Sequence, residues 1–379
     1  MCAVSAVCGG AYVTINGASY GSPSAVHNSA PANAGSKMIR PVSIADNESS
    51  PLAYAKTFSS DYKLSGPYSS KNLQIYLLSG ANKAEKWPFL AVHDAIEQKK
   101  AKIAETGDVN QLSITNKSDQ VVFIHSGDIL KGGNQDRMSQ YDAMIPPRQT
   151  LALAAFCVEQ DRWTKRGEES SENFAVPKPS SLPSYFPAKM KRSPALQGAT
   201  NGCIGPMISA ARLAGDQSAV WNTVSKAQSD LGYSTGANVK DSRSDSSFEL
   251  TLEGPAMQKA RLPYIDPLSD LPEKSETSIG YLAFVDGKYV AGDSYISHDL
   301  FMKMWPKMLC VRATDAIVAT KQPMKVSGTN PATLLSAKAQ RTEVNSRTTQ
   351  VARSIGRLAL FDTLDTKLQK SVHVSIARK

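Results

Sequence analysis

Two short apolar runs constrain the fold more than any other feature of this 379-residue chain. They are Q-V-V-F-I-H at 120–125 and L-A-L-A-A-F-C-V at 151–158. Successive side chains of a strand point to opposite faces, and both faces of each run would be apolar. Each run is therefore predicted to be a strand that is covered on both sides, and the second to be a central strand.

Further strands are predicted on both sides of these runs. Short segments rich in apolar and β-branched residues predict strands at 73–79, 101–105 and 112–116. The polar segment 116–119 has the length of a hairpin turn and is predicted to return the chain into the run 120–125. A clearer hairpin surrounds Asp286-Gly287, a dipeptide typical of primed turns, between T-S-I-G-Y-L-A-F-V and K-Y-V-A-G-D.

Helices are predicted between the strands. Pro88 favours a helix start at the head of F-L-A-V-H-D-A-I-E-Q-K. Asp216 is expected to cap a second helix that ends at Gly232, and Ser297 a third that Pro306 bends or breaks. Hairpins, strands covered on both sides and intervening helices together predict an α+β fold, with a mixed, mainly antiparallel, β-rich core and several packed helices.

Composition divides the chain into three predicted parts. Residues 1–70 are expected to be a disordered or weakly ordered N-terminal segment, because the first 36 hold no Asp, Glu, Lys or Arg and few large apolar side chains. Residues 71–316 are expected to form one α+β domain with a Pro-rich excursion at 165–201. Residues 317–379 are expected to be a basic C-terminal extension.

The extension carries most of the net charge. It holds eleven basic and three acidic residues, which is +8 of the total +9. A solvated, partly helical extension is favoured over a nucleic-acid contact, because aromatic residues are not interleaved with the basic ones. A protein partner could bind either this extension or the Pro-rich excursion. No transmembrane segment is predicted, because no run approaches about 18 apolar residues.

Cysteine and histidine spacing predicts neither a disulfide framework nor a metal site. The five cysteines are an odd number without metal-ligand spacing, and His93, His125 and His298 are scattered. The chain is therefore expected to need no cofactor. His125 is expected at the edge of the core, where it could meet the Glu159 segment across strands. The cysteines favour a reducing compartment such as the cytoplasm, and export stays open if residues 1–11 are the end of a signal segment.

The segment K-G-G-N-Q-D-R at 131–137 is the first candidate half-site. Gly132 and Gly133 allow a sharp turn and close approach of the backbone to a ligand, and exposed N–H groups in such a turn can bind an anion. Arg137 offers a planar fork for phosphate or carboxylate, and Gln135 can hydrogen-bond a sugar hydroxyl. The structural alternative is a hairpin turn with a surface salt bridge.

The segment E-Q-D-R-W at 159–163 is the second candidate half-site. Glu159 ends a buried strand, so its carboxylate must be paired or solvated. In the functional interpretation Glu159 is a general base or accepts from a ribose hydroxyl, while Arg162 and Trp163 hold an anionic, planar ligand. In the structural interpretation Glu159 forms a bridge to an arginine.

Several motifs together resemble one bacterial domain family. They are G-D-I-L-K-G-G-N-Q-D-R, I-P-P, F-C-V-E-Q-D-R-W, and G-Y-L-A-F-V-D-G-K-Y-V-A-G-D-S-Y followed by L-F-x-x-x-W-x-K-M-L. The family is named for its association with ADP-ribosylglycohydrolases and rhodanese-type phosphatases, and the resemblance covers roughly residues 73–316. It implies a role near NAD-derived or ADP-ribose metabolism. Its polar positions fall on Gly132, Gly133, Gln135, Arg137, Glu159, Arg162, Trp163 and Asp293.

Two functions follow from these observations. In the first, the chain binds or processes an ADP-ribose-like phosphosugar, with Glu159 catalytic and the other seven residues binding the ligand. In the second, the chain is a non-catalytic binding or scaffold protein, and the Glu/Arg cluster is an internal brace. Whether the two half-sites meet in an open cleft or in a closed bridge separates the two.

Overall fold

The computed structural model describes residues 50–84, 87–175, 202, 204–321 and 328–379. All of these belong to one unit. Within the described residues, no helix is both long and apolar enough to cross a membrane.

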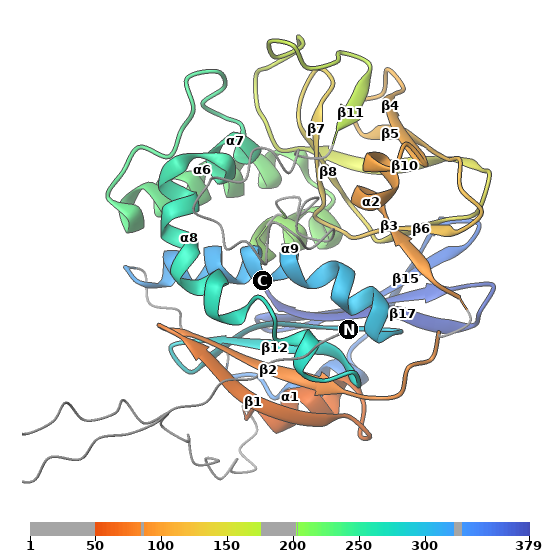
Figure 1. Ribbon diagram of the computed structural model, residues 1–379, viewed down its shortest axis with the longest axis vertical. Helices are drawn as coiled ribbons and strands as arrows, with labels where there is room; N and C mark the ends of the chain where they lie inside the picture. The colour runs from red at the N-terminus through yellow and green to blue at the C-terminus, as the bar shows by residue number, and fades with distance from the viewer. Residues whose placement is uncertain (1–49, 85–86, 176–201, 203, 322–327) are drawn as a thin grey trace, which may run out of the picture. The chain divides into compact units, whose positions relative to one another are not determined.

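The largest sheet has eight strands and is antiparallel throughout (Figure 1). Its strands come from both ends of the described chain: β1 and β2 lie near the start, and the other six lie after residue 277. β2 joins the two groups by pairing with β12. In spatial order the strands are β1 (Lys63–Ser70), β2 (Leu73–Ser79), β12 (Ser278–Val285), β13 (Lys288–Tyr295), β17 (Lys370–Arg378), β16 (Leu358–Asp365), β15 (Thr348–Ile355) and β14 (Gln340–Asn345).

Six further strands close into a small antiparallel barrel. In order around the barrel they are β10 (Thr150–Cys157), β5 (Gln111–Asn116), β4 (Ala101–Glu105), β11 (Asn173–Ala175), β7 (Ile129–Gly132) and β8 (Arg137–Ser139). A three-stranded sheet, β3 (Phe89–Ala91), β6 (Val121–Ile124) and β9 (Ala143–Ile145), shares an apolar core with the barrel. This core includes Ile103, Leu112 and Val122, each fully buried.

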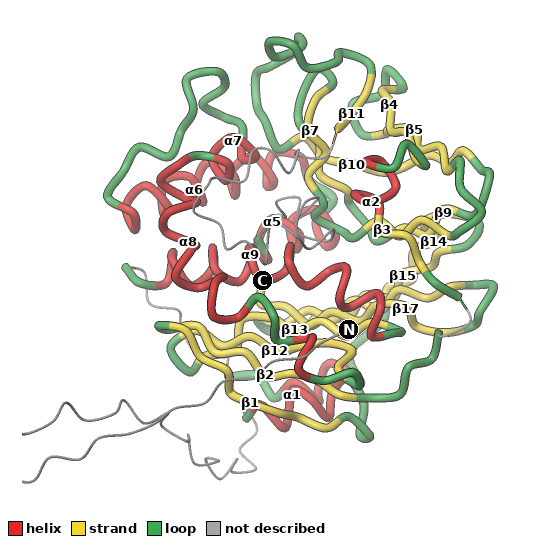
Figure 2. Tube along the Cα trace, viewed as in Figure 1, coloured by secondary structure: helices red, strands yellow, loops and turns green. Residues whose placement is uncertain are grey.

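The helices cover both faces of the large sheet (Figure 2). On one face α9 (His298–Ala319) packs against β12, and α6 (Gln217–Thr235) and α8 (Pro255–Leu268) pack against α9. On the other face Tyr54 of α1 (Pro51–Phe58) packs with Leu282. The remaining helical segments are α2 (Val92–Glu97), α5 (Gly205–Ser209), the π-helix η2 (Ala210–Ala214), α7 (Phe248–Glu253), and the 3-10 helices η3 (Pro272–Lys274) and η4 (Pro331–Ser336).

The predicted fold class is confirmed, as are the local signals that set several elements. Both residues of the Asp286-Gly287 turn have positive φ, 51° and 72°, as a primed turn requires. The side chains of Asp216 and Ser297 cap α6 and α9 by accepting hydrogen bonds from backbone N–H groups. α9 runs unbroken through Pro306, so of the two predicted effects of this proline the break does not occur, and the bend stays a prediction.

Three other local predictions are wrong because pairing or packing partners lie elsewhere. Phe89–Ala91 is a strand parallel to β6 rather than the start of a helix, and α2 begins only at Val92. α6 continues past Gly232, and Gly236 takes the left-handed conformation that ends it. β6 does not pair with β5 as a hairpin would require. The amide of Asn116 donates to the carbonyls of Gln120 and Ile145 instead, and directs the chain into the three-stranded sheet.

The expected domain limits also need correction. Of the segment expected to be weakly ordered, residues 51–58 form α1 and 63–70 form β1, and residues 1–49 lie outside the described part. The expected basic extension instead continues α9 to Ala319 and then supplies β14–β17, because apolar residues such as those of L-A-L-F at 358–361 are buried in the large sheet. In the Pro-rich excursion, Asn173–Ala175 is the barrel strand β11, and residues 176–201 lie outside the described part.

Candidate functional site

The first half-site, residues 131–137, consists of the turn between β7 and β8 and the strand ends that flank it. Gly132 and Gly133 both have positive φ, 121° and 56°. A Cβ on Gly133 would collide with the carboxylate of Glu105, so this glycine admits a protein group at close range. Oε1 of Glu105 accepts the backbone N–H of Asn134 at 3.1 Å. The hairpin of the structural alternative is therefore present. Asp136 and Arg137 are buried in it, whereas Lys131 is partly exposed and lies 2.6 Å from Glu253 in an ion pair.

Glu159 lies at the end of β10 with none of its surface exposed. Its Oε1 accepts from Arg166 at 2.9 Å, and its Oε2 accepts the backbone N–H of Asp136 at 2.9 Å and lies 2.7 Å from Arg162. Burial alone would raise the pKa of this carboxyl, but the bonds from Arg162, Asp136 and Arg166 lower it below its usual value. Both oxygens are thus occupied by protein donors.

Three residues of this cluster, Asp136, Arg166 and Glu169, were not among the predicted site residues. Asp136 accepts from Arg166 at 3.1 Å, from the Ser247 hydroxyl at 2.8 Å and from the backbone of Gly132 at 3.1 Å. Arg166 also bonds Glu169 at 3.1 Å. Asp136 lies within the first predicted segment, and Arg166 and Glu169 follow the second by three and six residues, so the density of charge in and after these segments was the available signal. We call Asp136, Glu159, Arg162, Arg166 and Glu169 the Glu159 cluster.

The Glu159 cluster brings the two predicted half-sites together. The guanidinium of Arg162 donates to the carbonyls of Gly133 at 3.1 Å and Gly132 at 3.3 Å, which ties the segment after β10 to the β7–β8 turn. The arrangement is a closed set of ion pairs. It favours the structural interpretation that the sequence left open, and the catalytic role of Glu159 stays a prediction.

The other predicted residues divide between buried and exposed positions. Arg137 is 2% exposed and donates to the carbonyl and side-chain oxygens of Gln135 at 3.2 and 3.1 Å. Its guanidinium therefore binds other protein groups and is not open to a ligand. Gln135 is fully buried, whereas Trp163 is 58% exposed. Asp293 lies in β13 and belongs to a second cluster. The eight predicted residues therefore do not line one cleft.

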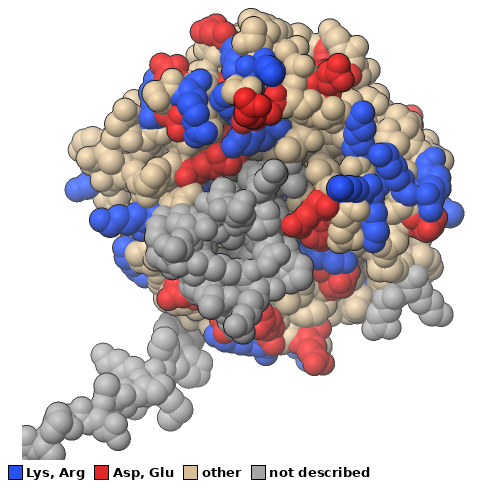
Figure 3. All heavy atoms as spheres, turned by 45° about the horizontal axis from the view of Figure 1, so that its top comes forward, with Lys and Arg blue, Asp and Glu red and all other residues tan. Residues whose placement is uncertain are grey.

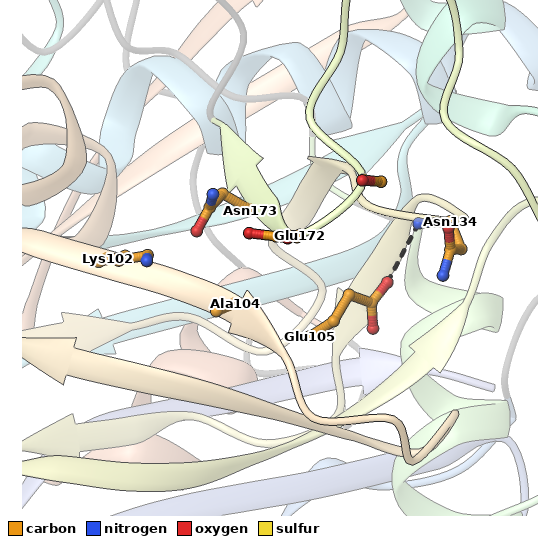
Figure 4. A pocket seen from close by; sticks show the side chains of 7 residues that line it. Lys102, Ala104, Glu105, Asn134, Glu172 and Asn173 are labelled. Carbon is orange, nitrogen blue, oxygen red and sulfur yellow. Dashed lines mark hydrogen bonds between the residues drawn. The ribbon is translucent and has the colours of Figure 1, made fainter.

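An open polar cavity of about 510 Å³ lies beside the β7–β8 turn (Figure 4). Its walls come from β4, the turn and the segment that leads into β11, and the lining residues are Lys102, Ala104, Glu105, Asn134, Ser171, Glu172 and Asn173. Oδ1 of Asn173 is buried and has no hydrogen-bond partner among the described residues.

Acidic and basic side chains are interspersed over the face of the molecule that Figure 3 shows.

The second cluster is buried between the three-stranded sheet and the large sheet. His373 of β17 lies with Nδ1 2.7 Å from Asp142 and Nε2 3.2 Å from Asp293. Burial alone would lower the pKa of His373, but Asp142 and Asp293 outweigh it and raise the pKa to about 9. His125 follows β6, and its ring centroid lies 4.6 Å from that of His373. Burial, Lys307 and His373 lower the pKa of His125 to about 4, so this imidazole is neutral.

This second cluster is also where the described residues could hold a metal ion. His125, Asp293 and His373 each offer one ligand atom, and these atoms lie within 4.8 Å of one another. His125 contacts this group rather than the Glu159 cluster that the sequence suggested. His373 was missed because it lies in the segment expected to be an extension. The available signal for a strand was V-H-V-S-I at 372–376, in which apolar and polar residues alternate.

One comparison with known proteins gives a match. A family model described as the ARG and Rhodanese-Phosphatase-superfamily-associated Protein domain matches residues 61–374. The match confirms the resemblance carried by the motifs and extends it through β14–β16 and into β17. No curated protein and no solved structure matches the chain.

Proposed function

Because this chain belongs to the ARG and Rhodanese-Phosphatase-superfamily-associated Protein domain family, we propose that it binds an ADP-ribose-like phosphosugar in the cavity beside the β7–β8 turn. The family's association with ADP-ribose-related proteins supports the ligand class. The observation that carries the location is the polar cavity itself, whose volume of about 510 Å³ falls in the range of small-molecule sites.

The lining suits the hydroxyl groups of a sugar better than a phosphate. The carboxylates of Glu105 and Glu172 can accept from ribose hydroxyls and would repel a phosphate at the same position. The unpartnered Oδ1 of Asn173 is a further buried acceptor that a hydroxyl would satisfy. Lys102 is the positively charged residue of the lining, so the phosphates of the ligand are expected to lie beside it.

The proposal assigns the predicted residues different roles from those that the motifs suggested. Gly132, Gly133, Arg137 and Arg162 shape and hold the turn beside the ligand. Trp163 remains the candidate for stacking on the adenine ring, because its indole is exposed. Glu159 supports the turn, since both its oxygens already accept hydrogen bonds from protein. The activity proposed is therefore binding, and no reaction is assigned to Glu159.

Titration calorimetry with ADP-ribose and with ADP tests this proposal. ADP-ribose is expected to bind at least tenfold more tightly than ADP, because its second ribose supplies the hydroxyls. Asn173→Ala is expected to weaken ADP-ribose binding about tenfold, which corresponds to one lost buried hydrogen bond of about 1.4 kcal/mol.

Lys274→Ala is the control for the calorimetry. Lys274 is half exposed in a surface pair with Asp270 and does not line the cavity. The Lys274→Ala variant is expected to bind ADP-ribose like the unsubstituted chain. Equal affinity for ADP and ADP-ribose, or unchanged binding by Asn173→Ala, would contradict the proposal.

A further inference from the structure

Two imidazoles and one carboxylate converge in the buried second cluster. We propose that His125, Asp293 and His373 bind one divalent transition-metal ion between the three-stranded sheet and the large sheet. This inference is independent of the proposed ligand in the barrel cavity, because none of these three residues lines that cavity.

His125 presents a lone pair that no described group satisfies. Its Nδ1 lies 2.6 Å from the carbonyl oxygen of Ser126, an acceptor, so Nδ1 carries the proton and Nε2 is unprotonated. Nε2 is buried and has no hydrogen-bond partner within the described part of the chain. A buried acceptor without a partner is costly in free energy, and a metal ion at Nε2 would satisfy it.

His373 is oriented in the way that metal-binding histidines usually are. Asp142 accepts from Nδ1 at 2.7 Å, which matches the carboxylate commonly found behind a ligating imidazole. Nε2 then faces Oδ1 of Asp293 at 3.2 Å. The Tyr281 hydroxyl donates to Oδ2 of Asp293, so Oδ1 is the oxygen left to ligate.

The donor set and its spacing select the class of ion. Zn²⁺ binds nitrogen and oxygen at roughly 2.0–2.2 Å, which places tetrahedral ligands about 3.3–3.5 Å apart. The Asp293–His373 pair, at 3.2 Å, is close to that separation, and all three ligand atoms lie within 4.8 Å of one another. Two imidazoles with one carboxylate favour a first-row transition metal over Mg²⁺ or Ca²⁺.

Metal binding has a defined proton balance. Without metal, Nε2 of His373 donates its proton to Asp293. The ion takes the place of that proton, which leaves to solvent, and no electron is transferred. The ligands come from β13 and β17 of the large sheet and from the residue after β6. The bound ion would therefore join the two sheets.

The test uses the full chain, stripped with a chelator and titrated with Zn²⁺ by calorimetry. One ion per chain is expected. His125→Gln and Asp293→Asn are each expected to weaken binding at least about a hundredfold. Loss of a residue that only hydrogen-bonds a metal ligand already costs about 10–100-fold, and loss of a ligand itself costs more. Tyr281→Phe removes the hydroxyl that donates to Asp293 and is expected to weaken binding about tenfold.

His93→Gln is the matched control. His93 is also buried, but its Nε2 lies 3.3 Å from Oδ1 of Asp94, and it does not belong to the group formed by His125, Asp293 and His373. Its substitution is expected to leave Zn²⁺ binding unchanged. Undiminished binding by both His125→Gln and Asp293→Asn would overturn the proposal.

A spectroscopic measurement keeps the test decisive if the variants fail to fold. Co²⁺ bound to the unsubstituted chain is expected to show visible d–d bands without a thiolate charge-transfer band, because all proposed ligands are nitrogen and oxygen. A strong thiolate band would place the ion on cysteine and overturn the proposal. Failure of the stripped chain to bind any of Zn²⁺, Co²⁺, Mn²⁺ or Fe²⁺ would also overturn it.

Discussion

At the scale of single residues, the same side chain supports opposite roles depending on what its polar atoms face. Glu159 and Arg137 have the residue types that a phosphosugar site needs, yet both are buried against protein partners. Asn173, which no motif indicated, leaves a buried oxygen unsatisfied at the cavity. A residue type in a sequence indicates which bonds are possible, and only its neighbours decide which are made.

Removing the charge of Glu159 is expected to destabilise the fold. Glu159→Gln leaves Arg162 and Arg166 buried with too little negative charge, and breaking a buried ion pair in this way costs about 3–5 kcal/mol. Chemical denaturation should show this loss in the free energy of unfolding. Asp119→Asn, in an exposed pair with Arg148, is the control and should cost less than about 1 kcal/mol. A Glu159→Gln variant as stable as the unsubstituted chain would restore the interpretation of Glu159 as a reactive group.

At the scale of elements, the last strand shows why composition misplaced the domain limit. The segment 317–379 is strongly basic as a whole. Within it, however, β17 places fully buried Val372 and Ile376 in the large sheet while Lys370 stays partly exposed. Average charge described the exposed positions of these strands and concealed the buried ones.

The position of β17 inside the large sheet can be tested by replacing isoleucine with aspartate at a buried position of β17 and, separately, at an exposed position of β15. Ile376→Asp places a charge in the core and is expected to abolish the cooperative thermal transition. Ile355→Asp, on β15 where the side chain is 37% exposed, is expected to change the free energy of unfolding by less than about 1 kcal/mol. Circular dichroism during heating measures both. Similar melting of the two variants would contradict this placement of β17.

At the scale of the whole molecule, buried polar groups connect the separate sheets. His373 of the large sheet bonds Asp142, which directly precedes β9 of the three-stranded sheet. Lys307 of α9 forms a buried pair with Asp128, directly before the barrel strand β7. Such contacts make the stability of the assembled fold depend on the charge state of a few interior groups.

The stability of the metal-free chain is therefore expected to fall as pH rises from about 6.5 to 9. His373 has a raised pKa of about 9 in the folded state, against about 6.5 when unfolded. Its contribution is complete below pH 6.5 and is lost as pH rises through 9, with a limiting slope of about 1.4 kcal/mol per pH unit. His125, Asp142, Asp293 and Arg212 do not titrate in this window, because the pKa of His125 is about 4, the pKa values of Asp142 and Asp293 are lowered, and Arg212 is a guanidinium. Burial raises the pKa of Asp362, which also interacts with His373, and this carboxyl is present in any His373 variant as well.

Denaturation of chelator-treated protein at several pH values measures this effect. The difference between the unsubstituted chain and His373→Gln isolates the contribution of His373, because all other titrating groups are common to both. This difference should shrink between pH 6.5 and 9. A difference that stays constant across that window would contradict the raised pKa.

The sequence by itself determined the elements whose cause lies within a few residues. The Asp286-Gly287 turn, the caps at Asp216 and Ser297, and the nearly fully buried strand β6 follow from local sequence. The prediction for the run 151–158 is confirmed only for the second half of β10, because Ala152 in its first half is exposed. The fold class followed from these elements, and the family motifs indicated the segments that form the Glu159 cluster.

Only the tertiary structure decided which segments meet. Asp293 and His373 are 80 positions apart and become neighbours because β13 pairs with β17. β6 pairs with β3 and β9 rather than with β5, although the chain between β5 and β6 has hairpin length. The physical reason is that strand pairing and buried ion pairs form between residues far apart in the sequence, and local backbone preferences do not determine which of these residues meet.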